Sequence, residues 1–137
     1  MRRTSLNKVS KGEIPRLQKR LWELCKLINR KEQPNVCYTC GAVGLEGSNW
    51  NTGHMWAKAS LSTHLKYDMR VLRSQCIRCN CHMGGMGADF YRNMVAEIGQ
   101  DAMNELEKER HILIKADKQW YLDKIAEYEK RLAVDNF

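Results

Sequence analysis

Apolar positions near the start of the chain repeat with the period of an α-helix. Between residues 14 and 28 they fall three and four positions apart, which places them on one stripe of a helix. Pro34 biases the preceding residue away from helical geometry, so we expect this helix to end by residue 35. Residues 1–13 are basic and polar, and they are expected to form a flexible arm.

The middle of the chain shows the pattern of strands. Residues 61–72 contain an alternation of apolar and charged side chains from residue 65 to residue 71, which is the period of a half-buried strand. A second short strand or hairpin is expected through His54. The pattern therefore predicts two strands that precede a helix.

Helical periodicity returns in the last third. We expect helices over residues 89–99 and 101–111, and a last helix that Asp117 caps. The apolar stripe of this last helix consists of Tyr121, Ile125, Tyr128 and Leu132. Such a stripe needs an apolar partner, which is either the stripe over residues 14–28 or a second copy of the chain.

Length and composition predict one compact unit. The chain has 137 residues, of which 43% are hydrophobic, enough for a modest core. No run approaches the roughly 18 apolar residues of a membrane span, and no apolar segment follows the basic N-terminus. We therefore expect neither membrane insertion nor secretion, and a cytoplasmic protein. In a reducing compartment, cysteines tend to be metal ligands or free thiols.

Four of the six cysteines form two Cys-x-x-Cys knuckles. These are Cys37 with Cys40, and Cys76 with Cys79. Two such pairs can close a tetrahedral structural Zn²⁺ site. Buried small side chains or disulfides are the alternative. Cys25 lies in the apolar pattern of the first helix, and Cys81 is either a bystander or a replacement ligand.

The positive charge is concentrated at the N-terminus. The net charge of +7 divides into +8 for residues 1–31, +2 for residues 32–83 and −3 for residues 84–137. A polyanion such as DNA is the natural partner of such a distribution. In the first helix the candidate phosphate contacts are Arg16, Lys19, Arg20 and Lys26. The alternative is that these side chains only form a solvated charged face.

The order of motifs around the knuckles resembles a known family. Gly-His follows the first knuckle, and His-Leu, Asp-Met-Arg, Cys-x-x-Cys-Asn-x-His-x-x-Gly and a Tyr follow in turn: Gly53-His54, His64-Leu65, Asp68-Met69-Arg70, residues 76–85 and Tyr91. The set is similar to the zinc-stapled HNH (ββα-metal) endonucleases such as endonuclease VII. It most resembles the lambda NinG (Rap) recombination nuclease family, over residues 37–99.

The resemblance implies a fold class and an activity. The expected fold is α+β, a small zinc-stapled ββα-metal (HNH-like) core flanked by an N-terminal basic helix and C-terminal helices. Residues 14–99 would hold the first helix and the core, and residues 100–137 a helical extension. The implied activity is metal-dependent endonucleolytic cleavage of branched DNA, a Holliday junction or a D-loop, during phage-type recombination in the cytosol of the bacterial host.

The resemblance also implies the roles of three residues. His54 would be the general base, since a pKa near 6.5 suits proton abstraction around neutral pH. Asn80 matches the last ligand of a catalytic Mg²⁺ or Mn²⁺, which would act as a Lewis acid on the phosphate. His82 is expected to contact either the ion or the phosphate.

Two positions depart from the family pattern. Gly53 stands where many HNH enzymes have an acidic metal ligand, and Asn51 or Asp68 is the candidate substitute. In the family pattern an Asn five residues before the second knuckle usually orients the base, and in this sequence that position is occupied by Val71. The remaining candidate phosphate contacts are Arg70 and Arg73. The alternative is that they are ordinary charged residues at the edge of a strand.

Three functions follow from these observations. The first is the endonuclease, for which a homodimer is a candidate assembly because a symmetric junction requires two active sites. The second is a zinc-stapled DNA-binding or protein-interaction module with weak or no catalysis, which the two departures favour. The third is a zinc-ribbon transcription factor, which would need no His54.

Overall fold

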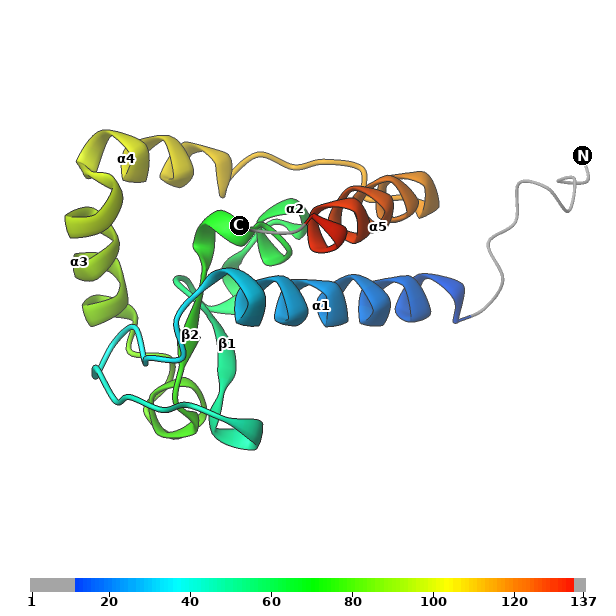
Figure 1. Cartoon of the computed structure of the whole chain (residues 1–137). Helices are drawn as coiled ribbons and strands as arrows, with labels where there is room; N and C mark the ends of the chain where they lie inside the picture. Colours follow the sequence, from blue (N-terminus) through cyan, green and yellow to red (C-terminus); the bar gives the residue numbers. More distant parts are fainter. Residues whose placement is uncertain (1–11, 135–137) are drawn as a thin grey trace, which may run out of the picture.

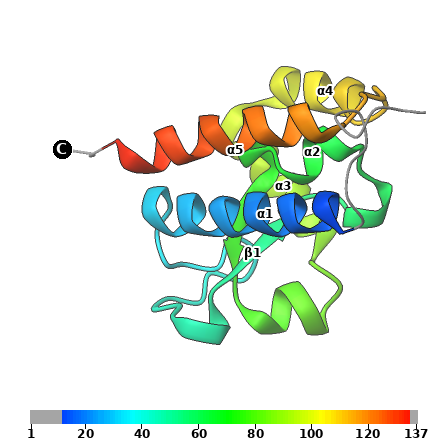
Figure 2. The same ribbon diagram turned by 90° about the vertical axis from the view of Figure 1, so that its right-hand side faces the viewer.

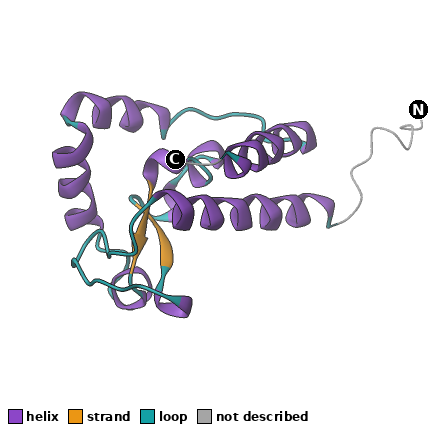
Figure 3. Cartoon of the chain, viewed as in Figure 1, coloured by secondary structure: helices purple, strands orange, loops and turns teal. Residues whose placement is uncertain are grey.

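The structure, a computed structural model, describes residues 12–134, in which helices surround one small sheet (Figure 1). Strand β1 (Asn51–His54) pairs antiparallel with β2 (Leu72–Gln75), from Asn51 opposite Gln75 to His54 opposite Leu72. Figure 3 shows these strands as the only sheet of the described chain. The predicted α+β class and a strand through His54 are confirmed. The arm predicted at residues 1–13 lies almost wholly outside the described residues.

The first and last helices pack side by side. Helix α1 (Glu13–Glu32) runs along α5 (Lys118–Ala133), as the turned view in Figure 2 shows. Their facing side chains form one hydrophobic cluster, which includes Leu21, Leu24, Ile28, Tyr121, Ile125 and Tyr128. The C-terminal stripe is thus buried against α1 within the same chain, so it does not offer the dimer interface considered above.

A second hydrophobic cluster lies under α3 (Gly87–Ile98) and α4 (Gln100–Glu109). Gly99, at a φ of 88°, separates the two helices, as predicted. The predicted cap of α5 is also confirmed, because the Asp117 carboxylate accepts a hydrogen bond of 3.0 Å from the Trp120 backbone N–H. No helix of the described residues is both long and apolar enough to cross a membrane.

The strand predicted over residues 61–72 was wrong. The segment forms two short turns, α2 (Thr63–Lys66) and η4 (Met69–Val71), which follow the turn η3 (Lys58–Ser60) and precede β2. Its apolar residues are buried as the alternation requires. However, the Asp68 side chain accepts a hydrogen bond from the Arg70 backbone N–H and starts η4, which replaces strand pairing with a turn.

Candidate functional site

The four knuckle cysteines converge on one point. Their sulfur atoms all lie within 4.8 Å of one another, and Cys40 and Cys76 are 3.8 Å apart. Zn–S bonds of about 2.3 Å place tetrahedral sulfurs roughly 3.8 Å apart, so the cluster fits Zn²⁺. All six cysteines are free thiols, which excludes the disulfide alternative. Cys81 lies outside the cluster, and Cys25 is buried in the core, where burial raises its pKa to about 12.

The second knuckle fixes the position of Asn80. Cys76 directly follows β2, and Cys79 lies in the π-helical turn η5 (Arg78–His82). The Asn80 backbone N–H donates to the Cys76 carbonyl at 3.0 Å. The Asn80 side-chain amide donates to Asn51 Oδ1 at 3.2 Å. The amide oxygen of Asn80 is therefore left to accept or to bind a cation.

His54 is held at two points of its ring. It is the last residue of β1, and its imidazole stacks on the Trp22 indole of α1, with ring centroids 5.1 Å apart and planes 14° apart. Its Nε2 lies 2.8 Å from the Lys66 backbone carbonyl. Because a carbonyl only accepts, Nε2 must carry the proton, which leaves Nδ1 as the basic nitrogen. Within the described part of the chain, Nδ1 has no hydrogen-bond partner.

Burial shifts the His54 imidazole toward its neutral form. Desolvation is the largest cause, and it lowers the pKa of His54 below its usual 6.5. The hydrogen bond to the Lys66 carbonyl opposes this, while the charges of Lys58 and Lys66 lower the pKa further. The imidazole is therefore ready to accept a proton at neutral pH.

His54 and Asn80 line one pocket of about 430 Å³. Trp22, Trp56 and Lys58 contribute to its wall, and Gly84, Gly85 and Gly87 form one side of it. The pocket thus combines a basic nitrogen, an amide oxygen and a lysine in one concave surface.

The two departures from the family pattern have a packing explanation. A Cβ atom at position 53 would lie 1.8 Å from Gln75 Oε1, so any side chain there requires the buried Gln75 to shift. The fully buried Gln75 donates from Nε2 to Thr39 Oγ1 and to the Gly85 carbonyl. Val71 is fully buried in the cluster under α3 and α4, where a polar amide would be costly. The His54 ring contacts Trp22 and the Lys66 carbonyl instead of an Asn at position 71.

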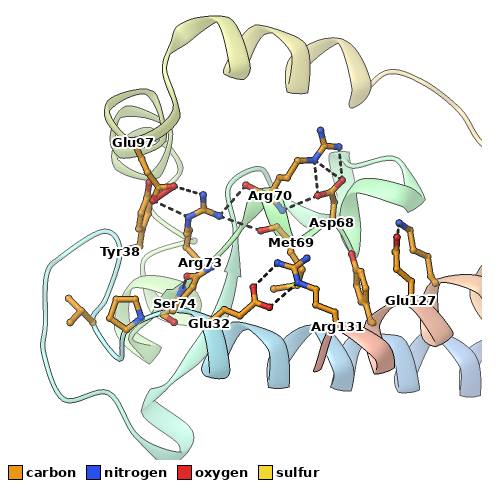
Figure 4. A pocket seen from close by; sticks show the side chains of 15 residues that line it. Glu32, Tyr38, Asp68, Met69, Arg70, Arg73, Ser74, Glu97, Glu127 and Arg131 are labelled. Carbon is orange, nitrogen blue, oxygen red and sulfur yellow. Dashed lines mark hydrogen bonds and ion pairs between the residues drawn. The ribbon is translucent and has the colours of Figure 1, made fainter. Parts of the chain in front are cut away.

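Other predicted site residues lie elsewhere. His82 is exposed at the end of η5 and does not line the pocket. Asp68 and Arg70 form an ion pair of 2.6 Å on a separate groove of about 790 Å³ (Figure 4). In the same groove Arg73 pairs with Glu97 at 2.6 Å. The structure does not bring Asp68, Arg70 or Arg73 to the His54 pocket.

The basic residues of α1 differ in their surroundings. Arg16 and Lys19 are exposed, and no ion pair involves them within the described ranges. Arg20 lies 3.5 Å from Glu129, and Lys26 lies 3.5 Å from Glu23. Arg16 and Lys19 are therefore the better placed of the four to attract an anion.

Sequence reasoning missed three groups at this site: Trp22, Lys58 and the Lys66 carbonyl. Trp22 did carry a signal, because it is a large aromatic residue off the apolar stripe of α1. The role of a backbone carbonyl leaves no signal in the sequence, because every residue type has one. No described group of three or more His, Cys, Asp or Glu side chains could hold a metal ion other than the cysteine cluster. The His54 pocket therefore offers no ready-made carboxylate site.

Comparisons with known proteins point to one family. The model of the bacteriophage lambda NinG protein family matches residues 2–134. The NinG protein of Escherichia phage lambda is 27% identical over 111 residues, which cover 77% of this chain and 50% of the relative. The NinG protein of Escherichia phage 933W is 30% identical over 80 residues, 58% of this chain and 38% of the relative. The chain thus spans about half the length of these relatives or less. No solved structure gives a significant match.

Proposed function

Because the chain belongs to the bacteriophage lambda NinG family, we propose that it is a metal-dependent DNA endonuclease with His54 as its general base. The observation that carries the proposal is the state of His54. Its Nε2 is occupied by a backbone carbonyl, its Nδ1 has no hydrogen-bond partner among the described residues, and Asn80 lines the same pocket. This is the arrangement that a hydrolytic general base requires.

The proposed reaction is hydrolysis of a phosphodiester bond. His54 Nδ1 takes a proton from the attacking water, while Nε2 keeps its own proton in the bond to Lys66. The Trp22 ring prevents the imidazole from tilting, so that Nδ1 stays directed at one point. The neutral form of His54, which burial favours, is the form that accepts the proton.

Asn80 is the protein ligand proposed for the catalytic ion. Mg²⁺ keeps several waters and is often held by one or two protein oxygens together with substrate phosphates. A single amide oxygen next to a DNA phosphate fits this mode of coordination, and Mn²⁺ could be bound in the same way. When bound, the ion supplies Lewis-acid stabilisation of the phosphate oxygens. Asn51 directs the Asn80 amide by accepting from its nitrogen.

DNA is the proposed partner, and branched DNA the proposed substrate. The net charge of +8 over residues 1–31 supports a polyanion. The preference for a Holliday junction or a D-loop, and the role in phage-type recombination, rest on the resemblance of the motifs.

The test is a cleavage assay with labelled four-way-junction DNA and linear duplex. The protein is incubated with Mg²⁺, with Mn²⁺ and with chelator, alongside His54→Ala and the control His111→Ala. We expect His54→Ala to slow cleavage about 10²-fold or more, since a general base contributes that much. His111, an exposed residue on the edge of α4, should be replaceable without effect.

The second candidate is a zinc-stapled DNA-binding module without catalysis. The absence of a carboxylate cluster from the described part of the His54 pocket favours it. If the wild-type protein binds the junction but cuts neither DNA with any divalent ion, this second function replaces the first.

A further inference from the structure

Lys58 is the one charged side chain among the residues that line the His54 pocket. The described lining contains no carboxylate. Lys58 begins the turn η3, is exposed, and forms no ion pair within the described ranges. The pocket therefore carries an uncompensated positive charge beside a histidine that is held neutral.

The Lys58 ammonium is also restrained. Its Nζ lies 5.2 Å from the centroid of the Trp22 ring, the same ring that stacks on His54. A cation over an indole face is attracted by the negative charge of the ring face. One indole thus sets the position of both the basic nitrogen and the ammonium, which ties the two groups together geometrically.

In the separate large groove, by contrast, positive and negative side chains pair with one another. There Arg70 pairs with Asp68, Arg73 with Glu97, and Arg131 with Glu32 (Figure 4). These cations are already neutralised and have little attraction left for an anion. Of these two hollows in the described chain, the small pocket is therefore the one with an unpaired cation available to an anion.

We propose that Lys58 binds a non-bridging oxygen of the DNA phosphate on which His54 acts, and so positions that phosphate. This inference rests on the proposed function, and it names a residue that the motifs do not include. A phosphodiester is the anion that fits, because it must meet a proton acceptor and the Asn80 oxygen in the same pocket. Lys58 is here a positioning residue that touches substrate.

The test compares Lys58→Gln and Lys58→Arg with the matched control Lys66→Gln. Lys66 also lies close enough to His54 for its charge to act on the imidazole, but it does not line the pocket. Binding of a labelled four-way junction is measured in chelator at several salt concentrations. Cleavage is measured separately with Mg²⁺ or Mn²⁺, and bound zinc and thermal unfolding verify that each variant is folded.

We expect Lys58→Gln to reduce the salt dependence of binding by about one phosphate contact, a change of roughly 0.9 in the slope of log K against log salt. Lys66→Gln should keep the wild-type slope, and Lys58→Arg should recover it. In the cleavage assay Lys58→Gln should lower kcat/KM about tenfold or more. A general loss of positive charge would lower kcat/KM equally in Lys58→Gln and Lys66→Gln.

The outcomes separate this inference from the proposed function. If Lys58→Gln binds with the wild-type slope and cleaves at the wild-type rate, the phosphate contact is refuted while the endonuclease stands. If the wild type never cleaves but Lys58→Gln alone shows the smaller slope, the endonuclease is refuted and the phosphate contact stands. Equal losses in Lys58→Gln and Lys66→Gln would also overturn the inference.

Discussion

The indole of Trp22 lies nearly parallel to the imidazole of His54, with planes 14° apart and centroids separated by 5.1 Å. The first residue belongs to α1 and the second to the end of β1. The N-terminal helix therefore forms part of the candidate active site, because it supports the side chain that the hairpin presents.

Replacing Trp22 should reduce cleavage more than DNA binding. In Trp22→Ala the imidazole loses one of its two restraints, and we expect cleavage to slow about tenfold, since small misplacements of a catalytic group have large effects on rate. Trp22→Phe keeps an aromatic face and should retain most of the activity. Single-turnover rates and junction affinities, measured well below the unfolding temperature, give the two effects separately.

Leu27→Ala is the control for this substitution. Leu27 lies on the same helix and is 47% exposed, so its loss leaves the site intact. Equal rates for Trp22→Ala and wild type would show that the stacking has no role in catalysis.

Loss of zinc should unfold the core. The free energy of a structural zinc site is folding free energy, so Cys79→Ser should bind no zinc and lose its cooperative thermal unfolding. Cys81→Ser is a matched control, because its sulfur lies outside the cluster and near Asn51 Oδ1, at 3.7 Å. It should retain zinc and melt like wild type. Metal content by mass spectrometry and melting by circular dichroism test both, and a zinc-free Cys79→Ser with normal melting would refute the staple.

The pH dependence of cleavage should follow His54. Burial lowers the pKa of this imidazole below 6.5, so the basic form predominates at pH 7 and above. The rate should be level there, and should fall only as the pH drops through a value below 6.5, where protonation of Nδ1 removes the base. Measurement of kcat/KM between pH 5 and 8 gives the midpoint. A midpoint above 6.5 would contradict the assignment of His54 as a buried base.

The contact between Gly53 and Gln75 should make position 53 intolerant of any side chain. A Cβ in Gly53→Ala would meet Gln75 Oε1 at 1.8 Å, and overpacking of this kind typically costs about 1–3 kcal/mol. Gly53→Ala combined with Gln75→Ala should cost less than the sum of the single changes, because the second removes the clash.

Gly87→Ala is the control for position 53. Its Cβ would meet only the Met55 carbonyl, at 4.0 Å. Denaturant unfolding should therefore show little change, whereas an equally mild effect for Gly53→Ala would show that the Gln75 side chain moves aside freely.

The exposed cations of α1 should contribute to DNA binding by simple charge. The double substitution Arg16→Gln with Lys19→Gln should lower the slope of log K against log salt by roughly 1.8, about 0.9 for each phosphate contact. Arg70→Gln should leave the slope unchanged, since Arg70 is already paired with Asp68 and Glu109. An unchanged slope in the double variant would leave α1 as an ordinary solvated helix.

The sequence predicted those features that depend on a repeated pattern or on a fixed spacing. The stripe of α1, the stop at Gly99, the cap at Asp117 and the convergence of two cysteine knuckles are of this kind. Residues 61–72 were predicted wrongly because every second residue from 65 to 71 is buried, as in a strand, but successive turns produce that burial. A period of two reports which side chains are inside, not how the backbone places them there.

The orientation of His54 could not be predicted, because the groups that hold it have no motif. One is a tryptophan from a helix more than thirty positions earlier in the sequence, and the other is the carbonyl of Lys66. The absence of Asn at Val71 suggested a loose base. The structure gives His54 two other supports, and a backbone carbonyl performs the same task with any side chain at position 66.

The tight fit of Gln75 over Gly53 restricts how this sequence can vary. The two residues lie two register positions apart on paired strands, since Gly53 lies opposite Arg73 and Asn51 lies opposite Gln75. A chain that acquires a carboxylate at position 53 must first acquire a small residue at position 75, or it loses stability before it gains an ion ligand. Among homologues we therefore expect positions 53 and 75 to covary. Glycine at position 53 should occur with a long side chain at position 75, and an acidic residue at position 53 with a short side chain at position 75.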